Sequence, residues 1–268
     1  MCRLVGWVSR TPVTLLDVLG AAAVARLRHL SNVHSDGWGA GWHDGRGELV
    51  TTKSGEQART DPKFDEFATG TAATAAIVHI RLGTPGFGHG TLNNHPFTDG
   101  PWAFAHNGAI GPGDRIDLLL DGDGTRPAGL TDSERYFLAL RANMMRADGS
   151  VPTAVDGVVA RMHRVGLATS SLNAMLLGPD GLHVISSHDA DWQATTIPVW
   201  PADELAGGVV PPPYFPMIHR ETDDVVVAVS SGIVSNLDGW KPIPNDAVYH
   251  VSATTRRTAI APLLAGVT

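Results

Sequence analysis

The sequence predicts an α+β fold, or layered sheets with helices outside them. Two segments, 37–53 and 172–186, each join two apolar runs through turn-forming residues and therefore predict antiparallel hairpins. Two helical segments, 131–145 and 151–165, stand next to each other between these hairpins. The chain has 268 residues, 43% of them hydrophobic and 18% charged, which is typical of a globular protein with an ample core. No repeat or low-complexity stretch divides it, so we expect one domain over residues 2–268.

The first half of the chain is expected to mix short strands with one helix. The apolar run 4–8 predicts a buried strand that holds Cys2 at its edge. Residues 14–30 carry apolar side chains at helical spacing, and Thr14 can cap that helix. The remaining predicted elements are strands 37–42 and 47–53 of the first hairpin, strand 73–80 and strand 102–105.

The second half begins with the two helices. The first opens on Thr131-Asp132-Ser133-Glu134, a capping-box pattern. Residues 198–216, with three consecutive prolines, predict an ordered irregular connection rather than a linker between domains. The predicted strands of this half are 172–177, 181–186, 225–230 and 247–251.

Composition narrows the class of function. A net charge of −7 without a basic stripe argues against a nucleic-acid partner. A single cysteine excludes intramolecular disulfides and multi-cysteine zinc sites, and it fits a reducing cytoplasm. No run of about 18 apolar residues predicts a membrane span. The first residues lack the charged and apolar regions of a signal peptide, so we expect the mature chain to begin here, less Met1.

The single cysteine is Cys2, directly after the initiator Met1. Removal of Met1 would leave one residue with both a thiol nucleophile and a free α-amine, whose ordinary pKa of about 7.7–8.0 suits a base near neutral pH. Position alone also fits an incidental cysteine near the start of a chain. The other polar motifs must decide between these interpretations.

Five short polar motifs, most of them at the ends of predicted strands, need an explanation. Each has a structural alternative: Asp36-Gly37 and Asn107-Gly108 fit turns, and 131–134 fits a helix cap. Arg81 fits a structural role less well, because a charge at the end of an apolar strand requires an anionic partner. His79, His89, His95 and His106 lack metal-binding spacing, so we expect them to be structural and predict no metal. The motifs are 34–39, 79–84, 93–97, 106–108 and 131–134.

Taken together and in this order, the motifs resemble those of the class II glutamine amidotransferases, N-terminal-nucleophile hydrolases whose mature first residue is cysteine. The resemblance runs from residue 2 to about residue 134 and continues more weakly beyond. It implies a four-layer αββα sandwich of two antiparallel sheets flanked by helices, with no cofactor. The matching residues are Cys2 with Arg3, Asp36-Gly37-Trp38-Gly39, His79-x-Arg81-x-x-Thr84-x-Gly86, Asn94-His95-Pro96-Phe97, His106-Asn107-Gly108 and Thr131-Asp132-Ser133-Glu134.

The resemblance also implies a role for each matching residue. Cys2 is expected to attack a γ-glutamyl carbonyl, with its own α-amine managing the proton. The Asn107 side chain and the Gly108 backbone N–H are expected to stabilise the oxyanion. Arg81 is expected to bind the substrate α-carboxylate and Asp132 the α-ammonium group. The substrate-binding set is completed by His79, Thr84 and Asp36.

The residues after about 170 are too few for the synthetase domain of biosynthetic amidotransferases, so we expect a protein that resembles the stand-alone hydrolases of small γ-glutamyl conjugates, as in ergothioneine biosynthesis. Three alternatives stay open: a glutaminase subunit that supplies ammonia to a separate synthetase, a catalytically silent ligand-binding member of the fold, and a metal hydrolase. A homodimer is also compatible with the sequence.

Overall fold

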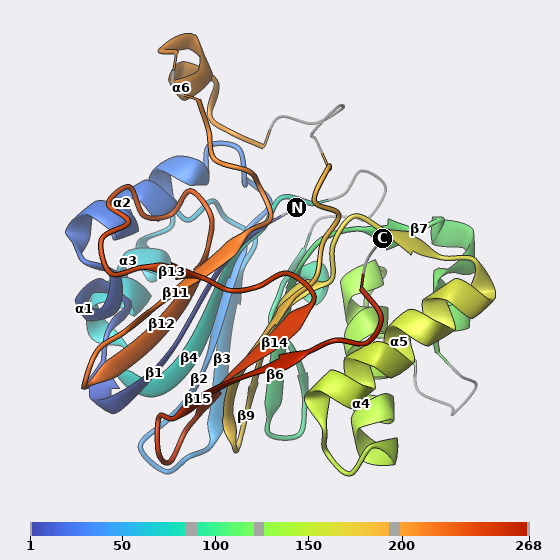
Figure 1. Ribbon diagram of the computed structural model, residues 1–268. Coiled ribbons are helices and arrows are strands. Elements are labelled where there is room, and N and C mark those ends of the chain that lie inside the picture. Colours follow the sequence, from blue (N-terminus) through green and yellow to red (C-terminus); the bar gives the residue numbers. More distant parts are fainter. Residues whose placement is uncertain (1, 84–89, 121–125, 193–198, 209, 267–268) are drawn as a thin grey trace.

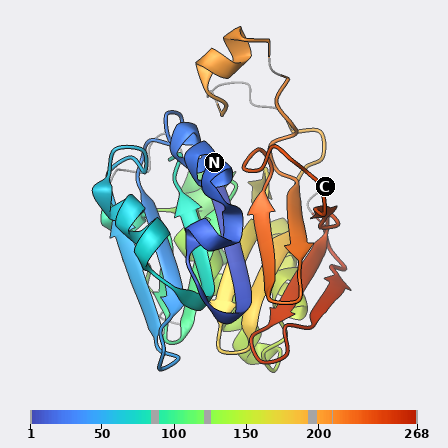
Figure 2. The same cartoon turned by 90° about the vertical axis from the view of Figure 1, so that its left-hand side faces the viewer.

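A computed structural model describes residues 2–83, 90–120, 126–192, 199–208 and 210–266. In these residues two large antiparallel sheets lie face to face, and helices cover the outer face of each sheet (Figure 1). Figure 2 views the same arrangement from the side of the first sheet's helices. The predicted four-layer αββα sandwich is therefore confirmed.

The first sheet has seven strands in the order β13-β11-β12-β1-β4-β2-β3. Strand β1 lies inside it, between β12 and β4, and its apolar sequence fits burial on both faces. Because Arg3 pairs with Ile80, Cys2 stands where β1 begins and β4 ends. The strands are β1 (Arg3–Val13), β2 (Trp38–His43), β3 (Leu49–Ser54), β4 (Ala73–Ile80), β11 (Met217–Glu221), β12 (Val225–Ser230) and β13 (Lys241–Pro242).

The second sheet has six strands in the order β15-β14-β10-β9-β6-β5, and both predicted hairpins are present. Asn107 pairs with Asn173, so these two residues mark one end of this sheet. The strands are β5 (Phe97–Asp99), β6 (Trp102–Asn107), β9 (Asn173–Gly178), β10 (Gly181–Ser186), β14 (Ala247–Ser252) and β15 (Thr258–Pro262), with the separate pair β7 (Ile110–Gly111) and β8 (Ala168–Thr169).

The helices match the prediction except at three places. The single helix expected over 14–30 is wrong: Gly20, with φ of 79°, divides it in two, although Thr14 does cap the first part. A helix over Pro62–Gly70 was not predicted, and the connection 198–216 contains a short one. The helices are α1 (Leu15–Leu19), α2 (Ala21–Leu30), α3 (Pro62–Gly70), α4 (Asp132–Arg146), α5 (Val151–Val165) and α6 (Ala202–Ala206), with 3-10 turns η1 (Thr91–Asn93) and η2 (Gly113–Leu119).

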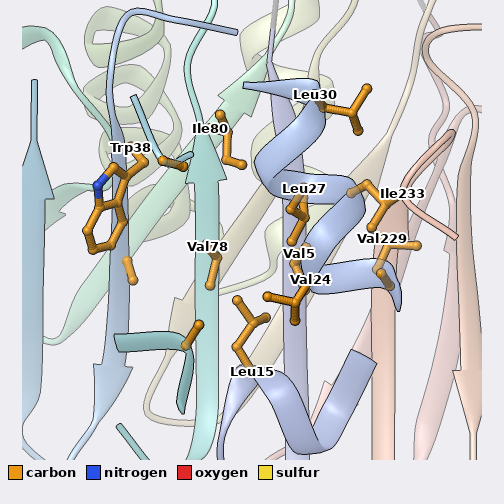
Figure 3. Close-up of a cluster of buried hydrophobic side chains, with 14 of the residues drawn as sticks. Val5, Leu15, Val24, Leu27, Leu30, Trp38, Val78, Ile80, Val229 and Ile233 are labelled. Atoms are coloured by element: carbon orange, nitrogen blue, oxygen red, sulfur yellow. The ribbon is translucent and has the colours of Figure 1, made fainter. Parts of the chain in front are cut away.

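The core forms three clusters, one for each interface between layers. Between the first sheet and α1–α3, Leu15, Val24 and Leu27 pack on Val5 and Val229 (Figure 3). The second cluster lies between the two sheets, and the third lies between the second sheet and α4 and α5. These interfaces hold the ends of β1, β4 and β6 against one another. In the described parts of the chain, no helix is both long and apolar enough to cross a membrane.

Candidate active site

Cys2 is buried at the start of β1, with only 5% of its surface exposed. Its backbone nitrogen donates to Asn107 Oδ1 at 2.7 Å. Its carbonyl oxygen accepts from the Tyr214 hydroxyl at 3.1 Å, and its Sγ lies 3.8 Å from the Leu82 carbonyl oxygen. Contacts from three distant segments thus fix the residue that the sequence analysis selected as the nucleophile.

The surroundings of Cys2 favour its thiolate. Burial by itself raises the pKa of the thiol, but the charges of His79 and of the amino terminus, together with the hydrogen bonds of the sulfur, lower it by more. The result is a Cys2 pKa of about 6, below the ordinary value of 9.0. A thiol with this pKa is mostly ionised at neutral pH, and the thiolate is the nucleophilic form of cysteine.

Asn107 is the last residue of β6 and contacts Cys2, and Gly108 follows it and lines the same cavity as Cys2. The Asn107 amide is buried, and its Nδ2 has no hydrogen-bond partner among the described residues. A buried hydrogen-bond donor without an acceptor costs free energy, so Asn107 Nδ2 is suited to donate to a negatively charged oxygen. A side chain at Gly108 would overlap the Ser171 carbonyl oxygen. The hairpin-turn alternative for this pair is wrong, because β6 pairs with β5 and β9 and not with the strand that follows it.

Arg81 follows β4, and Asp36 organises the backbone around it. The Arg81 N–H donates to the Gly37 carbonyl at 2.9 Å, and the Asp36 N–H donates to the Arg81 carbonyl at 3.1 Å. The Asp36 carboxylate in turn accepts from the Gly83 N–H at 2.6 Å. Arg81 is buried and lines the same small cavity as Cys2, whereas Asp36 braces the segment that carries Arg81.

Asp132 is the first residue of α4 and is also buried against the cavity. Its Oδ2 accepts from the Ile110 N–H at 2.7 Å and its Oδ1 from the Ser133 N–H at 2.8 Å. The predicted capping box is only half correct. Thr131 accepts from the Glu134 N–H, but the Glu134 carboxylate accepts from Ala128 and Gly129 instead of returning to Thr131.

Three histidines of the site, His79, His95 and His106, are buried. His79 and His95 lie with ring centroids 4.0 Å apart. Burial first, and then the neighbouring His79, hold the pKa of His95 well below its ordinary value. His106 bridges Ser133 Oγ at 2.9 Å and the Ser171 carbonyl at 3.0 Å, and burial lowers its pKa as well. His95 and His106 line the cavity.

The structure brings together most, but not all, of the predicted site. The described residues that line the cavity include Cys2, Arg81, Gly108 and Asp132, while His79 stands behind Cys2 on the neighbouring strand. Thr84 and His89 lie outside the described residues. The cavity measures about 20 Å³, room for roughly one water molecule.

Two aromatic residues that the sequence does not predict as part of the site support the amino terminus. The Arg3 guanidinium lies 4.0 Å from the Tyr214 ring and 4.3 Å from the Trp200 ring, in cation–π contact with both. The Tyr214 hydroxyl also lies 3.1 Å from His34 Nε2. Tyr214 belongs to the connection after α6. Because 212 positions separate it from Cys2 along the chain, no local sequence pattern indicates their contact.

Comparison with known proteins agrees with this geometry. Residues 1–195 match the family model of the glutamine amidotransferases class-II. The chain belongs to the class II glutamine amidotransferases. It is therefore an enzyme of a glutamine amidotransferase type, and the resemblance inferred from the ordered motifs is confirmed.

Relatives of this amidotransferase include hydrolases. It is 30% identical over 131 residues to the gamma-glutamyl-hercynylcysteine sulfoxide hydrolase of Mycolicibacterium smegmatis, a match that covers 46% of this chain and 56% of that protein. With the protein of the same name from Mycobacterium tuberculosis it shares 26% identity over 94% of this chain and 93% of the relative. A putative glutamine amidotransferase of Haemophilus influenzae is 32% identical over 51% of this chain and 46% of its own length.

Solved structures of the class share the fold. A glutamine aminotransferase class-II domain protein from Silicibacter pomeroyi superposes with a TM-score of 0.64 at 19% identity, covering 98% of this chain and 99% of that one. The glutamine phosphoribosylpyrophosphate amidotransferase of Bacillus subtilis superposes with a TM-score of 0.58 at 14% identity, covering 97% of this chain and 49% of that one.

Proposed function

We propose that this chain hydrolyses γ-glutamyl amides through a thioester on Cys2. The observation that carries the proposal is the 2.7 Å contact between the Cys2 nitrogen and Asn107 Oδ1, because the same Asn107 side chain keeps a buried Nδ2 without a partner among the described residues. One side chain thus orients the nitrogen that becomes the α-amine once Met1 is removed, and offers a donor to the reacting oxygen.

The reaction follows from these positions. The Cys2 thiolate attacks the γ-carbonyl carbon, and Asn107 Nδ2 with the Gly108 N–H stabilises the oxyanion. The C–N bond breaks, and the Cys2 α-amine, directly or through water, passes the proton to the leaving amine. Water then attacks the γ-glutamyl thioester, which releases glutamate and restores the thiol.

Recognition of the substrate head is assigned to two buried charges at the cavity. The Arg81 guanidinium suits a planar carboxylate, and the Asp132 carboxylate suits an ammonium group. Together they select a free α-amino acid head and place its γ-carbonyl at Cys2. Thr84, His79 and Asp36 remain proposed members of this set, with Asp36 acting through the segment that carries Arg81.

For the leaving group we propose a small sulfur-containing amine of the kind that the mycobacterial relatives' name describes. The match to the M. tuberculosis hydrolase over nearly the whole of both chains supports this substrate class. A glutaminase subunit that serves a separate synthetase is the alternative. A single domain over residues 2–268, a cytoplasmic location and a homodimer remain predictions.

A panel of γ-glutamyl amides tests the proposal. Purified enzyme is incubated with glutamine, a γ-glutamyl anilide and γ-glutamyl conjugates of cysteine derivatives, and glutamate is measured. We expect conjugates to be hydrolysed faster than glutamine and the Cys2→Ala variant to release none. Turnover of glutamine alone, rising with an added synthetase, would favour the alternative, and no glutamate from any substrate would exclude both.

A further inference from the structure

The second sheet carries a group of potential metal ligands that the reaction does not use. Asp180 lies in the turn between β9 and β10, His183 lies on β10 and His250 lies on β14. One ligand atom from each lies within 4.8 Å of the others, and among the described residues this is the one such group of three. No local sequence pattern points to this group, because 67 positions separate His183 from His250.

Strand pairing places the two imidazoles together. His183 and His250 are direct partners in the β10–β14 ladder, so their side chains share one face of the sheet. Their ring centroids lie 4.2 Å apart and the rings are nearly parallel, at 14°. Trp102 packs beside His183 at 6.2 Å between centroids. The pair is therefore held by the sheet itself and not by a loop.

Asp180 is fixed beside these rings by its turn. Its carbonyl oxygen accepts from the Ala253 N–H at 2.9 Å, and a side chain at the neighbouring Gly181 would overlap the Val251 carbonyl. The Asp180 Oδ2 lies 2.9 Å from His183 Nε2 and 3.7 Å from His250 Nε2. Ligand atoms on one ion with bonds of about 2.1 Å lie about 3.0–3.4 Å apart at tetrahedral or octahedral angles. The two observed distances bracket this range.

Two ring nitrogens of the group, His250 Nε2 and His183 Nδ1, make no hydrogen bond of normal length to the residues that the structure describes. His250 Nε2 is buried and has no hydrogen-bond partner among the described residues, although it faces Asp180 at a distance too long for a hydrogen bond. His183 is only 6% exposed, and its Nε2 is the ring nitrogen that faces Asp180 Oδ2. The Asp180 side chain is 53% exposed, so an ion can arrive from solvent and keep water as a further ligand.

We propose that Asp180, His183 and His250 bind a divalent transition-metal ion of the zinc or cobalt class. Two imidazoles and one carboxylate with an open position are typical of such ions rather than of calcium or magnesium, which prefer oxygen ligands. The site would tie the β9–β10 turn to β14. The proposed site is separate from Cys2. Cys2 contacts Asn107, which pairs with the first residue of β9, whereas Asp180 follows the last residue of β9. Figure 1 shows β9 ending at the bottom of the sheets, away from the amino terminus.

Cobalt titration tests the site. Untagged full-length Cys2→Ala protein is freed of metal with chelator, desalted and titrated with Co²⁺ while visible d–d absorption is recorded. The Cys2 substitution removes the thiolate, which would otherwise bind the ion itself. We expect saturation at one Co²⁺ per chain, and about tenfold or greater loss of affinity on Asp180→Asn or His250→Gln, since even outer-shell changes cost 10–100-fold.

His219→Gln is the matched control. His219 is also a buried strand histidine beside a carboxylate, with Nδ1 3.2 Å from Glu221 Oε1, but it has no second histidine in such a group. Its substitution should leave Co²⁺ affinity unchanged, and circular dichroism confirms that each variant is folded. Absence of Co²⁺ binding at millimolar concentration, or equal binding by folded Asp180→Asn and His250→Gln, would overturn the proposal.

Discussion

At the scale of single residues, Asn107 serves two purposes with one side chain. Its Oδ1 holds the Cys2 nitrogen and its Nδ2 remains available in the buried site. A hairpin turn would have explained Asn107-Gly108 just as well from sequence, so the tertiary contact with Cys2 distinguishes the two interpretations.

Asn107→Ala should lower kcat about 100–1000-fold, the usual cost of losing one oxyanion-hole donor. Asn107→Asp is the sharper variant, because it keeps an oxygen acceptor for the Cys2 nitrogen but loses the N–H donor. We expect Asp to be nearly as inactive as Ala. Steady-state kinetics on a γ-glutamyl anilide measures this, and full kcat in the Asp variant would remove Asn107 from the oxyanion site.

The pKa of the Cys2 thiol is about 6, below the ordinary value of 9.0, so the thiol should titrate with a midpoint near pH 6. Since the thiolate is the nucleophile, the rate of alkylation by iodoacetamide should rise with pH through 6 and level off by neutrality. Intact mass spectrometry follows the reaction, with urea-unfolded protein as the control that titrates near the ordinary value. A folded-state midpoint above 8 would contradict the proposed activation.

At the scale of elements, prediction from sequence succeeds where local signals suffice. Strand β4 and helix α5 have the predicted bounds, because a continuous apolar run defines the strand and Ser150 and Gly166 cap the two ends of the helix. The helix over 14–30 fails at Gly20, and the short exposed edge strand β15 carries no alternation strong enough to detect.

The same reasoning explains which site residues were found. The predicted site residues stand at the ends of predicted elements, and the structure brings Arg81, Asn107 and Asp132 close to Cys2. Tyr214 was missed because its contact with Cys2 depends on how the connection after α6 folds back. No periodicity within that segment encodes this contact.

Asp36 joins the start of β2 to the segment after β4, so its loss should disturb Arg81 rather than the chemical step. Asp36→Ala should raise KM about tenfold, because a hydrogen bond to a charged group is worth about 1.5–3 kcal/mol, with a smaller change in kcat. Asp44→Ala is the control: Asp44 makes similar bonds to the backbone of the β2–β3 turn. An unchanged KM in Asp36→Ala would show that the brace does not position Arg81.

At the scale of the whole molecule, glycines set how closely the layers approach. A side chain at Gly39, in β2 of the first sheet, would overlap the carbonyl oxygen of His95, which leads into the second sheet. Close packing against His95 therefore explains the glycine at position 39 of the Asp36-Gly37-Trp38-Gly39 motif.

Gly39→Ala should destabilise the fold by about 1–3 kcal/mol, the usual cost of overpacking. Gly70→Ala is the matched control at the end of α3, where a Cβ meets nothing within 4 Å, and it should be neutral or slightly stabilising. Urea unfolding followed by tryptophan fluorescence gives both values. Equal stability of the two variants would contradict the close approach of the sheets at Gly39.

The central claim is that Cys2 carries the γ-glutamyl group during turnover. Acid-quenching the enzyme during hydrolysis of a slow γ-glutamyl amide, followed by intact mass and peptide mapping, tests it directly. We expect a chain that lacks Met1, a glutamyl adduct on the peptide that begins with Cys2, and neither adduct nor glutamate from a folded Cys2→Ala variant. Glutamate release by Cys2→Ala at the wild-type rate would contradict the account.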